Sequence, residues 1–219
     1  RYSNIYLVTS SVDKEKLSLL FKKYEKKIKI RPNWVEVTDS KGFGERFDNR
    51  LISIGRLEKQ KNYNSLIDKL HNSNLIVDIY GEGTEEENLT KLSKSLNVKL
   101  TIKNPINNNL LLQELLKYKI FVSSSNFEGN PKGILEAMAS GCVVIAKDNI
   151  NISEIIENNH NGFLVEENDY NKLSELFSNV YDEDLTKIVE NGRKFIEEKF
   201  SPEDMCLRVF KVYKDTLNS

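Results

Sequence analysis

Two glutamates, Glu128 and Glu136, flank a turn of small residues in the stretch FEGNPKGILEAMASG, residues 127–141. The turn leads into a predicted helix that starts at Pro131, because proline suits the first helical position. Backbone N–H groups at a helix start bind anions, and glycine lets a ligand approach them. Carboxylates beside an anion are unfavourable unless the ligand also offers hydroxyl groups. The stretch therefore predicts a site for an anion that carries hydroxyls.

The helix that follows this turn is amphipathic. At 100° per residue its large apolar side chains share one face, and Glu136 lies nearly opposite them. We therefore expect Glu136 to face solvent or a cleft. The simpler interpretation is a polar surface on which Lys132 and Glu136 form an i,i+4 ion pair.

A second group of residues suits a diphosphate. In SIGRLEKQKN, residues 53–62, Gly55 ends a predicted strand, and Arg56 and Lys61 follow it. Arginine binds phosphate oxygens as a planar fork and lysine as a point charge. The alternative is that both are solvated surface cations, since Lys59 lies among them.

The stretch YGEGTEEENL, residues 80–89, resembles a dinucleotide-binding fingerprint, because a strand ends in Gly-x-Gly before a helix. However, Glu86 occupies the position of the third glycine, and its acidic neighbours would repel a pyrophosphate. We therefore exclude NAD binding. We interpret Gly81 and Gly83 as turn glycines at the rim of a site.

Short apolar segments that alternate with amphipathic helices would position these residues. Because the segments are apolar throughout, they are typical of parallel strands buried on both faces. Strands that alternate with helices favour right-handed βαβ units, and ligands bind at the carboxyl ends of such strands. The predicted fold class is α/β, a Rossmann-like parallel sheet with helices on both faces. The predicted strands are 5–9, 50–55, 75–81, 98–102, 119–124, 142–146 and 162–166.

The chain divides into four predicted segments. They are a strand with a Lys-rich helix over 13–27, a linker, the main sheet domain, and a terminal helix; their ranges are 1–30, 31–48, 49–199 and 200–219. The linker is marked by Pro32, Gly42 and Gly44, which interrupt the alternation. The last part of the chain is predicted to be helical over 169–180, 183–199 and 201–217, the last with Ser201 as N-cap and Pro202 at its first position.

Composition limits the functional class. The chain has 219 residues, 39% hydrophobic and 30% charged, with 32 basic against 33 acidic side chains. This balance does not favour a nucleic-acid partner. Cys142 and Cys206 form no disulfide framework, and the two histidines are isolated, so we expect a cytoplasmic protein with no metal and no cofactor. The chain opens almost directly on a strand, so we expect it to be part of a longer protein.

Four stretches carry a resemblance to a known family. GRLEKQKN, IYGEGTEEENL, FEGNPKGILEAMASGCVVIA and ISEIIENNHNGFLV occur in the order and spacing of the C-terminal half of retaining family 4 glycosyltransferases, which have the GT-B fold. The spacing of Glu128 and Glu136 is a hallmark of that family. IRPNWVEV resembles its interdomain linker, and FSPEDMCLRVFKVYKD resembles its terminal helices, which cross back to the first domain. Most of the N-terminal domain, which binds the acceptor in relatives, has no counterpart here.

The resemblance implies a nucleotide-diphosphate sugar as ligand, with UDP as the commonest nucleotide in such families. By analogy, Glu136 accepts hydrogen bonds from the ribose, Glu128 contacts the donor sugar, and Arg56 and Lys61 neutralise the departing diphosphate. The nucleobase is expected against residues 102–106. The remaining expected donor contacts are Gly55, Gly129, Asn130, Pro131, Lys132, Gly133 and Ile106.

The expected activity is sugar transfer to a glycan or lipid-linked acceptor, in the synthesis of surface polysaccharide or glycoconjugates. These residues alone are expected to bind the donor but to be inactive. The alternative is a non-catalytic nucleotide-sugar-binding module or partner subunit. The Lys-rich helix over 13–27 is interpreted as a solvated face, with peripheral contact at the inner face of the membrane as the second interpretation.

Overall fold

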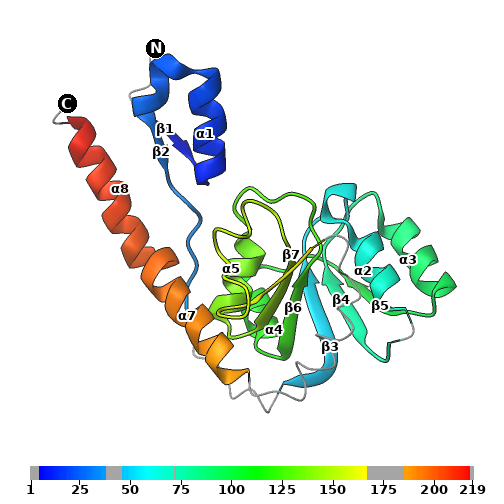
Figure 1. Cartoon of the computed structure of the whole chain (residues 1–219). Helices are drawn as coiled ribbons and strands as arrows, with labels where there is room; N and C mark the ends of the chain where they lie inside the picture. The colour runs from blue at the N-terminus through cyan, green and yellow to red at the C-terminus, as the bar shows by residue number, and fades with distance from the viewer. Residues whose placement is uncertain (1–4, 38–45, 72, 167–184, 218–219) are drawn as a thin grey trace.

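The computed structural model describes residues 5–37, 46–71, 73–166 and 185–217. Its main feature is a six-stranded sheet in which all neighbouring strands are parallel (Figure 1). The strand order is β5-β4-β3-β6-β7-β8. The strands are β3 (Phe47–Ile54), β4 (Ile76–Tyr80), β5 (Lys99–Lys103), β6 (Tyr118–Ser123), β7 (Val143–Lys147) and β8 (Phe163–Val165).

Helices cover both faces of this sheet, which confirms the predicted fold class. Leu51 and Ile52 are adjacent in β3, both are fully buried, and each belongs to a different core cluster. A strand buried on both faces needs such a continuous apolar run. On the Leu51 side lie α2 (Tyr63–Lys69) and α3 (Glu86–Ser95), and on the Ile52 side lie α4 (Asn108–Leu115), α5 (Lys132–Ala139) and the end of α7 (Thr186–Phe200).

The N-terminal residues form a separate small unit. Strands β1 (Tyr6–Val8) and β2 (Ile28–Ile30) pair in parallel, with α1 (Ser11–Leu20) and a 3₁₀ helix, η1 (Lys22–Lys27), between them. The predicted single helix over 13–27 is therefore wrong. The α-helix ends before Phe21, whose φ of −130° and ψ of 55° are not helical.

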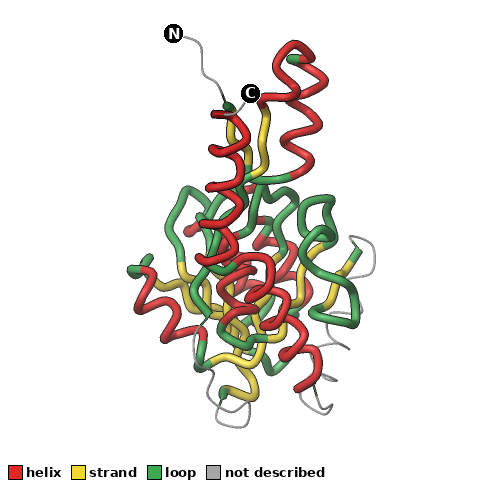
Figure 2. Tube along the Cα trace, turned by 90° about the vertical axis from the view of Figure 1, so that its left-hand side faces the viewer, coloured by secondary structure: helices red, strands yellow, loops and turns green. Residues whose placement is uncertain are grey.

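The last helix, α8 (Pro202–Leu217), lies beside this N-terminal unit. Figures 1 and 2 show both projecting from the same end of the main domain. Side chains of β1, β2 and α8 line a common crevice, including Leu7, Ile30 and Val209. The predicted N-cap is confirmed, because the Asp204 N–H donates to Ser201 Oγ over 3.2 Å.

Two boundaries differ from the prediction. The linker was expected to extend to residue 48, but β3 already begins at Phe47. Arg46 is buried, and its guanidinium donates to the carbonyl oxygens of Ser140 (2.8 Å) and Gly141 (3.0 Å) at the end of α5. Residues 46–48 therefore belong to the sheet domain. The helix expected over 169–180 lies outside the described residues, and α7 takes the place of the one expected over 183–199.

Within the described ranges, no helix combines the length and the apolar character that crossing a membrane requires.

Candidate functional site

A cavity of about 370 Å³ lies at the carboxyl ends of β3 and β6, against the start of α5; we call it the edge cavity. This is where an open parallel sheet places its ligands. The structure brings nine of the eleven predicted site residues into its wall. These are Gly55, Arg56, Lys61, Glu128, Asn130, Pro131, Lys132, Gly133 and Glu136.

An ion pair spans one side of the edge cavity. Lys61 Nζ lies 2.6 Å from Glu128 Oε1, and the two side chains are 21% and 12% exposed. Lys61 ends the 3₁₀ helix η3 (Lys59–Lys61), and its carbonyl oxygen accepts from Ser124 Oγ over 2.8 Å. Arg56, by contrast, is exposed, and it makes no ion pair with any residue that the structure describes.

Glycines behind the edge cavity allow this arrangement. A Cβ on Gly55 would lie 2.8 Å from Lys61 Cε, so a side chain there would displace the lysine. A Cβ on Gly81 would lie 1.9 Å from the Gly55 carbonyl oxygen, and one on Gly83 would lie 2.5 Å from the Leu57 carbonyl oxygen. The prediction that Gly81 and Gly83 rim the site is wrong. They line neither of the cavities described in this subsection, because they pack behind the loop that carries Arg56.

Glu136 lines the edge cavity and is only 4% exposed, so it faces the cavity and not the outer surface. Its Oε1 atom accepts from Asn108 Nδ2 over 2.5 Å and lies 3.1 Å from Lys132 Nζ. The i,i+4 pair that the simpler interpretation expected is therefore present. It does not lie on an open surface, however, because the carboxylate is enclosed between two helices.

The helix start differs by one residue from the prediction. Helix α5 begins at Lys132, and Pro131 precedes it with a non-helical ψ of 85°. The Pro131 carbonyl accepts from the N–H groups of Ile134 (3.0 Å) and Leu135 (3.2 Å). The N–H groups of a first helical turn lack intrahelical acceptors, and Lys132 and Gly133 both line the edge cavity. The anion-binding geometry expected there is thus retained.

The predicted linker contributes directly to this site, which the sequence reasoning missed. The Asn33 N–H donates to Asn130 Oδ1 over 2.8 Å, and Asn33 Nδ2 donates to the Asn130 carbonyl over 2.9 Å. From the other side, Asn151 Nδ2 donates to the Glu128 carbonyl. The loop over 127–131 is therefore fixed at two points. The only signal in the sequence was an amide residue beside a tryptophan in an otherwise irregular stretch.

A second cavity, of about 350 Å³, lies on the other side of Glu136; we call it the linker cavity. One wall is residues 31 and 33–36, and the other comes from the start of α4. Glu136 and Lys132 line both cavities. The linker cavity is lined by Arg31, Asn33, Trp34, Val35, Glu36, Asn108, Asn109, Leu112, Lys132 and Glu136.

Two predicted residues lie outside both cavities. Ile106 is half-buried and packs against the core cluster that contains Leu112. Gly129 is directed toward the N-terminal unit, where a Cβ on it would have Thr9 Oγ1 as its neighbour at 3.9 Å. The structure therefore brings neither residue to a cavity wall.

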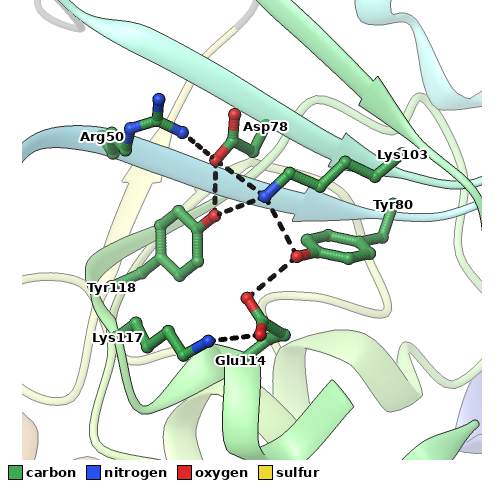
Figure 3. Close-up of polar contacts among 7 residues, drawn as sticks. All are labelled: Arg50, Asp78, Tyr80, Lys103, Glu114, Lys117 and Tyr118. Carbon is green, nitrogen blue, oxygen red and sulfur yellow. Dashed lines mark hydrogen bonds and ion pairs between the residues drawn. The ribbon is translucent and has the colours of Figure 1, made fainter. Parts of the chain in front are cut away.

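A buried charge cluster in the sheet was not predicted (Figure 3). Asp78, in the middle of β4, is fully buried, and its Oδ2 contacts Arg50 Nη1 (2.6 Å), Tyr118 OH (2.5 Å) and Lys103 Nζ (3.3 Å). Burial by itself would raise the pKa of Asp78. The hydrogen bond from Tyr118 and the charges of Lys103 and Arg50 outweigh it and hold the pKa below its usual value.

The same cluster fixes α4. Tyr80 OH donates to Glu114 Oε2 over 3.0 Å, and Lys103 Nζ donates to Tyr80 OH over 3.1 Å, as Figure 3 shows. Glu114 lies in the last turn of α4, while Asn108, which contacts Glu136, is its first residue. The cluster therefore anchors one end of the helix whose other end holds the cavity carboxylate.

Among the described residues, no group of three or more His, Cys, Asp and Glu side chains is placed to hold a metal ion.

Comparison with known proteins gives consistent results. Residues 39–195 match the model of the family described as glycosyl transferases group 1. The chain is 26% identical over 160 residues to poly(ribitol-phosphate) alpha-N-acetylglucosaminyltransferase of Staphylococcus aureus (strain COL), covering 72% of this chain and 32% of that protein. It is 28% identical over 151 residues to N-acetylgalactosamine-N,N'-diacetylbacillosaminyl-diphospho-undecaprenol 4-alpha-N-acetylgalactosaminyltransferase of Campylobacter jejuni, covering 67% and 41%.

Solved structures share the fold. A mutant of S. aureus TarM in complex with fondaparinux, alpha-GlcNAc-glycerol and UDP superposes with a TM-score of 0.82 at 23% identity, over 96% of this chain and 44% of that one. The pneumococcal O-GlcNAc transferase GtfA in complex with UDP and GlcNAc gives a TM-score of 0.79 at 22% identity, over 99% and 46%. At these identities the likeness establishes the fold alone. The chain spans less than half the length of each of these proteins.

Proposed function

Because this chain belongs to the group 1 glycosyl transferases, we propose that it is the donor-binding half of a retaining enzyme that transfers a sugar from a nucleotide diphosphate. The observation that carries the proposal is the edge cavity. It combines three cations (Arg56, Lys61 and Lys132), a helix start and two carboxylates at the carboxyl edge of the sheet.

Each part of a nucleotide sugar has a matching group in that wall. The diphosphate would lie between the side chains of Arg56 and Lys61 and the N–H groups at the start of α5. Glu136 would accept hydrogen bonds from the ribose hydroxyls through its second oxygen, Oε2. Both partners described above, Asn108 and Lys132, contact the first oxygen, Oε1. Glu128 would contact hydroxyls of the sugar, beside the β-phosphate that Lys61 holds.

The chemistry requires charge to be stabilised at two points. The bond between the anomeric carbon and the β-phosphate oxygen breaks, and its electron pair stays on the phosphate. The sugar gains oxocarbenium character until the acceptor hydroxyl oxygen bonds to the anomeric carbon and passes its proton to an oxygen of the departing diphosphate. Fixed cations stabilise the leaving diphosphate without rearrangement, so the proposal requires no metal.

We further propose UDP as the nucleotide, since the TarM and GtfA complexes named above contain UDP. The acceptor would be a glycan or a lipid-linked glycan in the synthesis of a surface polymer, as the names of the two curated relatives suggest. In this proposal, the acceptor is bound by a part of the protein outside these 219 residues.

The test is calorimetric titration of the purified chain with UDP, GDP and ADP, in the presence of EDTA. We expect selective binding of UDP, and we expect Glu136→Ala to weaken it at least tenfold, because two charge-assisted hydrogen bonds to the ribose are lost. The matched control is Glu157→Ala, which removes an exposed glutamate that lines neither cavity. Equal binding by the wild type and Glu136→Ala would contradict the role of Glu136.

A further inference from the structure

We propose that Tyr63 is a positioning residue for Lys61: its buried hydroxyl accepts a hydrogen bond from the Lys61 ammonium when a diphosphate draws that ammonium away from Glu128. The inference rests on the proposed function and deepens it, because Tyr63 would act on the diphosphate without being part of the edge-cavity wall. Tyr63 is the first residue of α2, and it was not among the predicted site residues.

Tyr63 and Lys61 meet over Gly55, in the space that a side chain of this glycine would occupy. A Cβ there would lie 2.8 Å from Lys61 Cε and 3.0 Å from the Tyr63 hydroxyl oxygen. Between the two residues, Asn62 has a left-handed backbone with φ 53° and ψ 36°, which asparagine tolerates better than most residues. This turn joins the end of η3 to the start of α2. The hydroxyl therefore lies beside the methylene groups that carry the Lys61 ammonium.

The Tyr63 hydroxyl is buried without a partner. The residue is 3% exposed, and its OH makes no hydrogen bond to any residue that the structure describes. Burial raises the pKa of Tyr63 to about 12; Ser53 acts in the opposite direction without forming a hydrogen bond of normal geometry, and the charge of Glu128 raises the pKa further. The phenol is therefore neutral at pH 7 and has free lone pairs. Because an unpaired buried hydroxyl destabilises the folded state, its position beside the site calls for a partner.

Lys61 has donors to spare for this acceptor. An ammonium group carries three N–H donors, and among the described residues its side-chain partner is Glu128, at 2.6 Å. A phosphate oxygen in the edge cavity would take a second donor and draw Nζ away from the carboxylate. The Tyr63 hydroxyl then accepts from the third. A flexible lysine that is held by several fixed acceptors loses less binding energy to its own ordering.

Tyr63→Phe tests the inference, because it removes the hydroxyl and keeps the ring. We expect calorimetry to show roughly three- to tenfold weaker binding of both UDP and inorganic pyrophosphate, since both would contact Lys61. We also expect the thermal midpoint without added ligand to rise by about 2–4 °C, because an unpaired buried hydroxyl has been removed. A tyrosine that only supports the fold would not give weaker binding by a more stable protein.

Tyr118→Phe is the matched control, since it makes the same change in a buried tyrosine whose hydroxyl has a partner, Asp78. It should lower the thermal midpoint and leave pyrophosphate affinity unchanged. A double-mutant cycle shows whether Tyr63 acts through Lys61. Once Lys61→Gln is in place, Tyr63→Phe should cause no further loss of affinity for UDP or pyrophosphate.

Wild-type affinity for UDP and pyrophosphate in Tyr63→Phe would overturn this inference and leave the proposed function standing. An equal loss of affinity from Tyr63→Phe with and without Lys61→Gln would overturn it too, since the hydroxyl would then not act through the lysine. A lower thermal midpoint in Tyr63→Phe would also overturn it, because the hydroxyl would already be paired in the free protein. Failure of the wild type to bind any of the three nucleotides would contradict both proposals.

Discussion

Lys61 is paired with a carboxylate. Its 2.6 Å contact with Glu128 partly neutralises one of the two side-chain cations assigned to the diphosphate. A ligand phosphate must therefore share Lys61 with Glu128 or displace it. This competition limits how tightly the edge cavity binds a phosphate group.

We expect Glu128→Gln to tighten pyrophosphate binding about threefold, because a partly exposed ion pair contributes up to about 1 kcal/mol. Lys61→Gln should weaken it. Calorimetry with pyrophosphate measures both changes without involving the sugar. Weaker binding by Glu128→Gln would show instead that the carboxylate orients Lys61 and does not compete for it.

At the scale of elements, the Asp78 cluster joins four neighbouring strands and α4. Arg50, Asp78, Lys103 and Tyr118 belong to β3, β4, β5 and β6 in turn. Removing one member of a buried ion pair leaves the other charges without compensation. We therefore expect the cluster to matter for both stability and the position of α4.

Asp78→Asn should lower the free energy of unfolding by about 3 kcal/mol at pH 7. The folded-state pKa of Asp78 is depressed, so this stabilisation is present above the unfolded pKa and disappears as pH falls through the folded pKa. The gap between wild type and variant should therefore narrow below about pH 4.

Urea unfolding at pH 7, 5, 4 and 3 measures this gap. Asp48→Asn is the matched control, because the Asp48 side chain is 78% exposed beside Lys119 and should contribute little. A gap that stays constant down to pH 3 would show that the loss in Asp78→Asn comes from packing and not from charge.

The sequence predicted most of the elements because buried parallel strands leave a clear apolar signal. It did not predict the Asp78 cluster, since a single aspartate in LIVDIYG has partners on three other strands, and their register is not visible in a local pattern. Arg46 was missed for the same reason, because its acceptors lie about 95 residues away.

The candidate site was predicted better than its surroundings. Arg56, Lys61, Glu128 and Glu136 follow strand ends or begin a helix, and parallel topology brings such positions to one edge of the sheet. Trp34 could not be predicted in this way. It reaches the site only because the segment around it packs across α4 and the end of α7.

At the scale of the whole molecule, the chain spans 32% and 41% of its two curated relatives named above. Transfer requires an acceptor held against the anomeric carbon and exclusion of water, which a closing second domain commonly supplies. We therefore expect these 219 residues to bind UDP but to transfer sugar at least roughly a thousandfold more slowly than a chain of the relatives' full length.

UDP release from a panel of UDP-sugars, with the S. aureus relative as positive control, measures this difference. Turnover near that of the control would contradict the expectation that the second part of the protein is needed.

The two hydrogen bonds between Asn33 and Asn130 have a thermodynamic consequence. They connect the segment that leads from the N-terminal unit to the loop that carries Glu128, so the angle of that unit and the shape of the loop are not independent variables. A ligand that prefers one loop shape then also favours one angle of the N-terminal unit. A second partner that binds at one angle changes the affinity for the ligand by some factor, and the ligand changes the affinity for that partner by the same factor. Asn33→Ala would remove the bond from Nδ2 and keep the one from the backbone N–H, so it would weaken this reciprocity while leaving every side chain of the edge cavity in place. Asn33 is therefore a position at which allosteric coupling can be separated from binding.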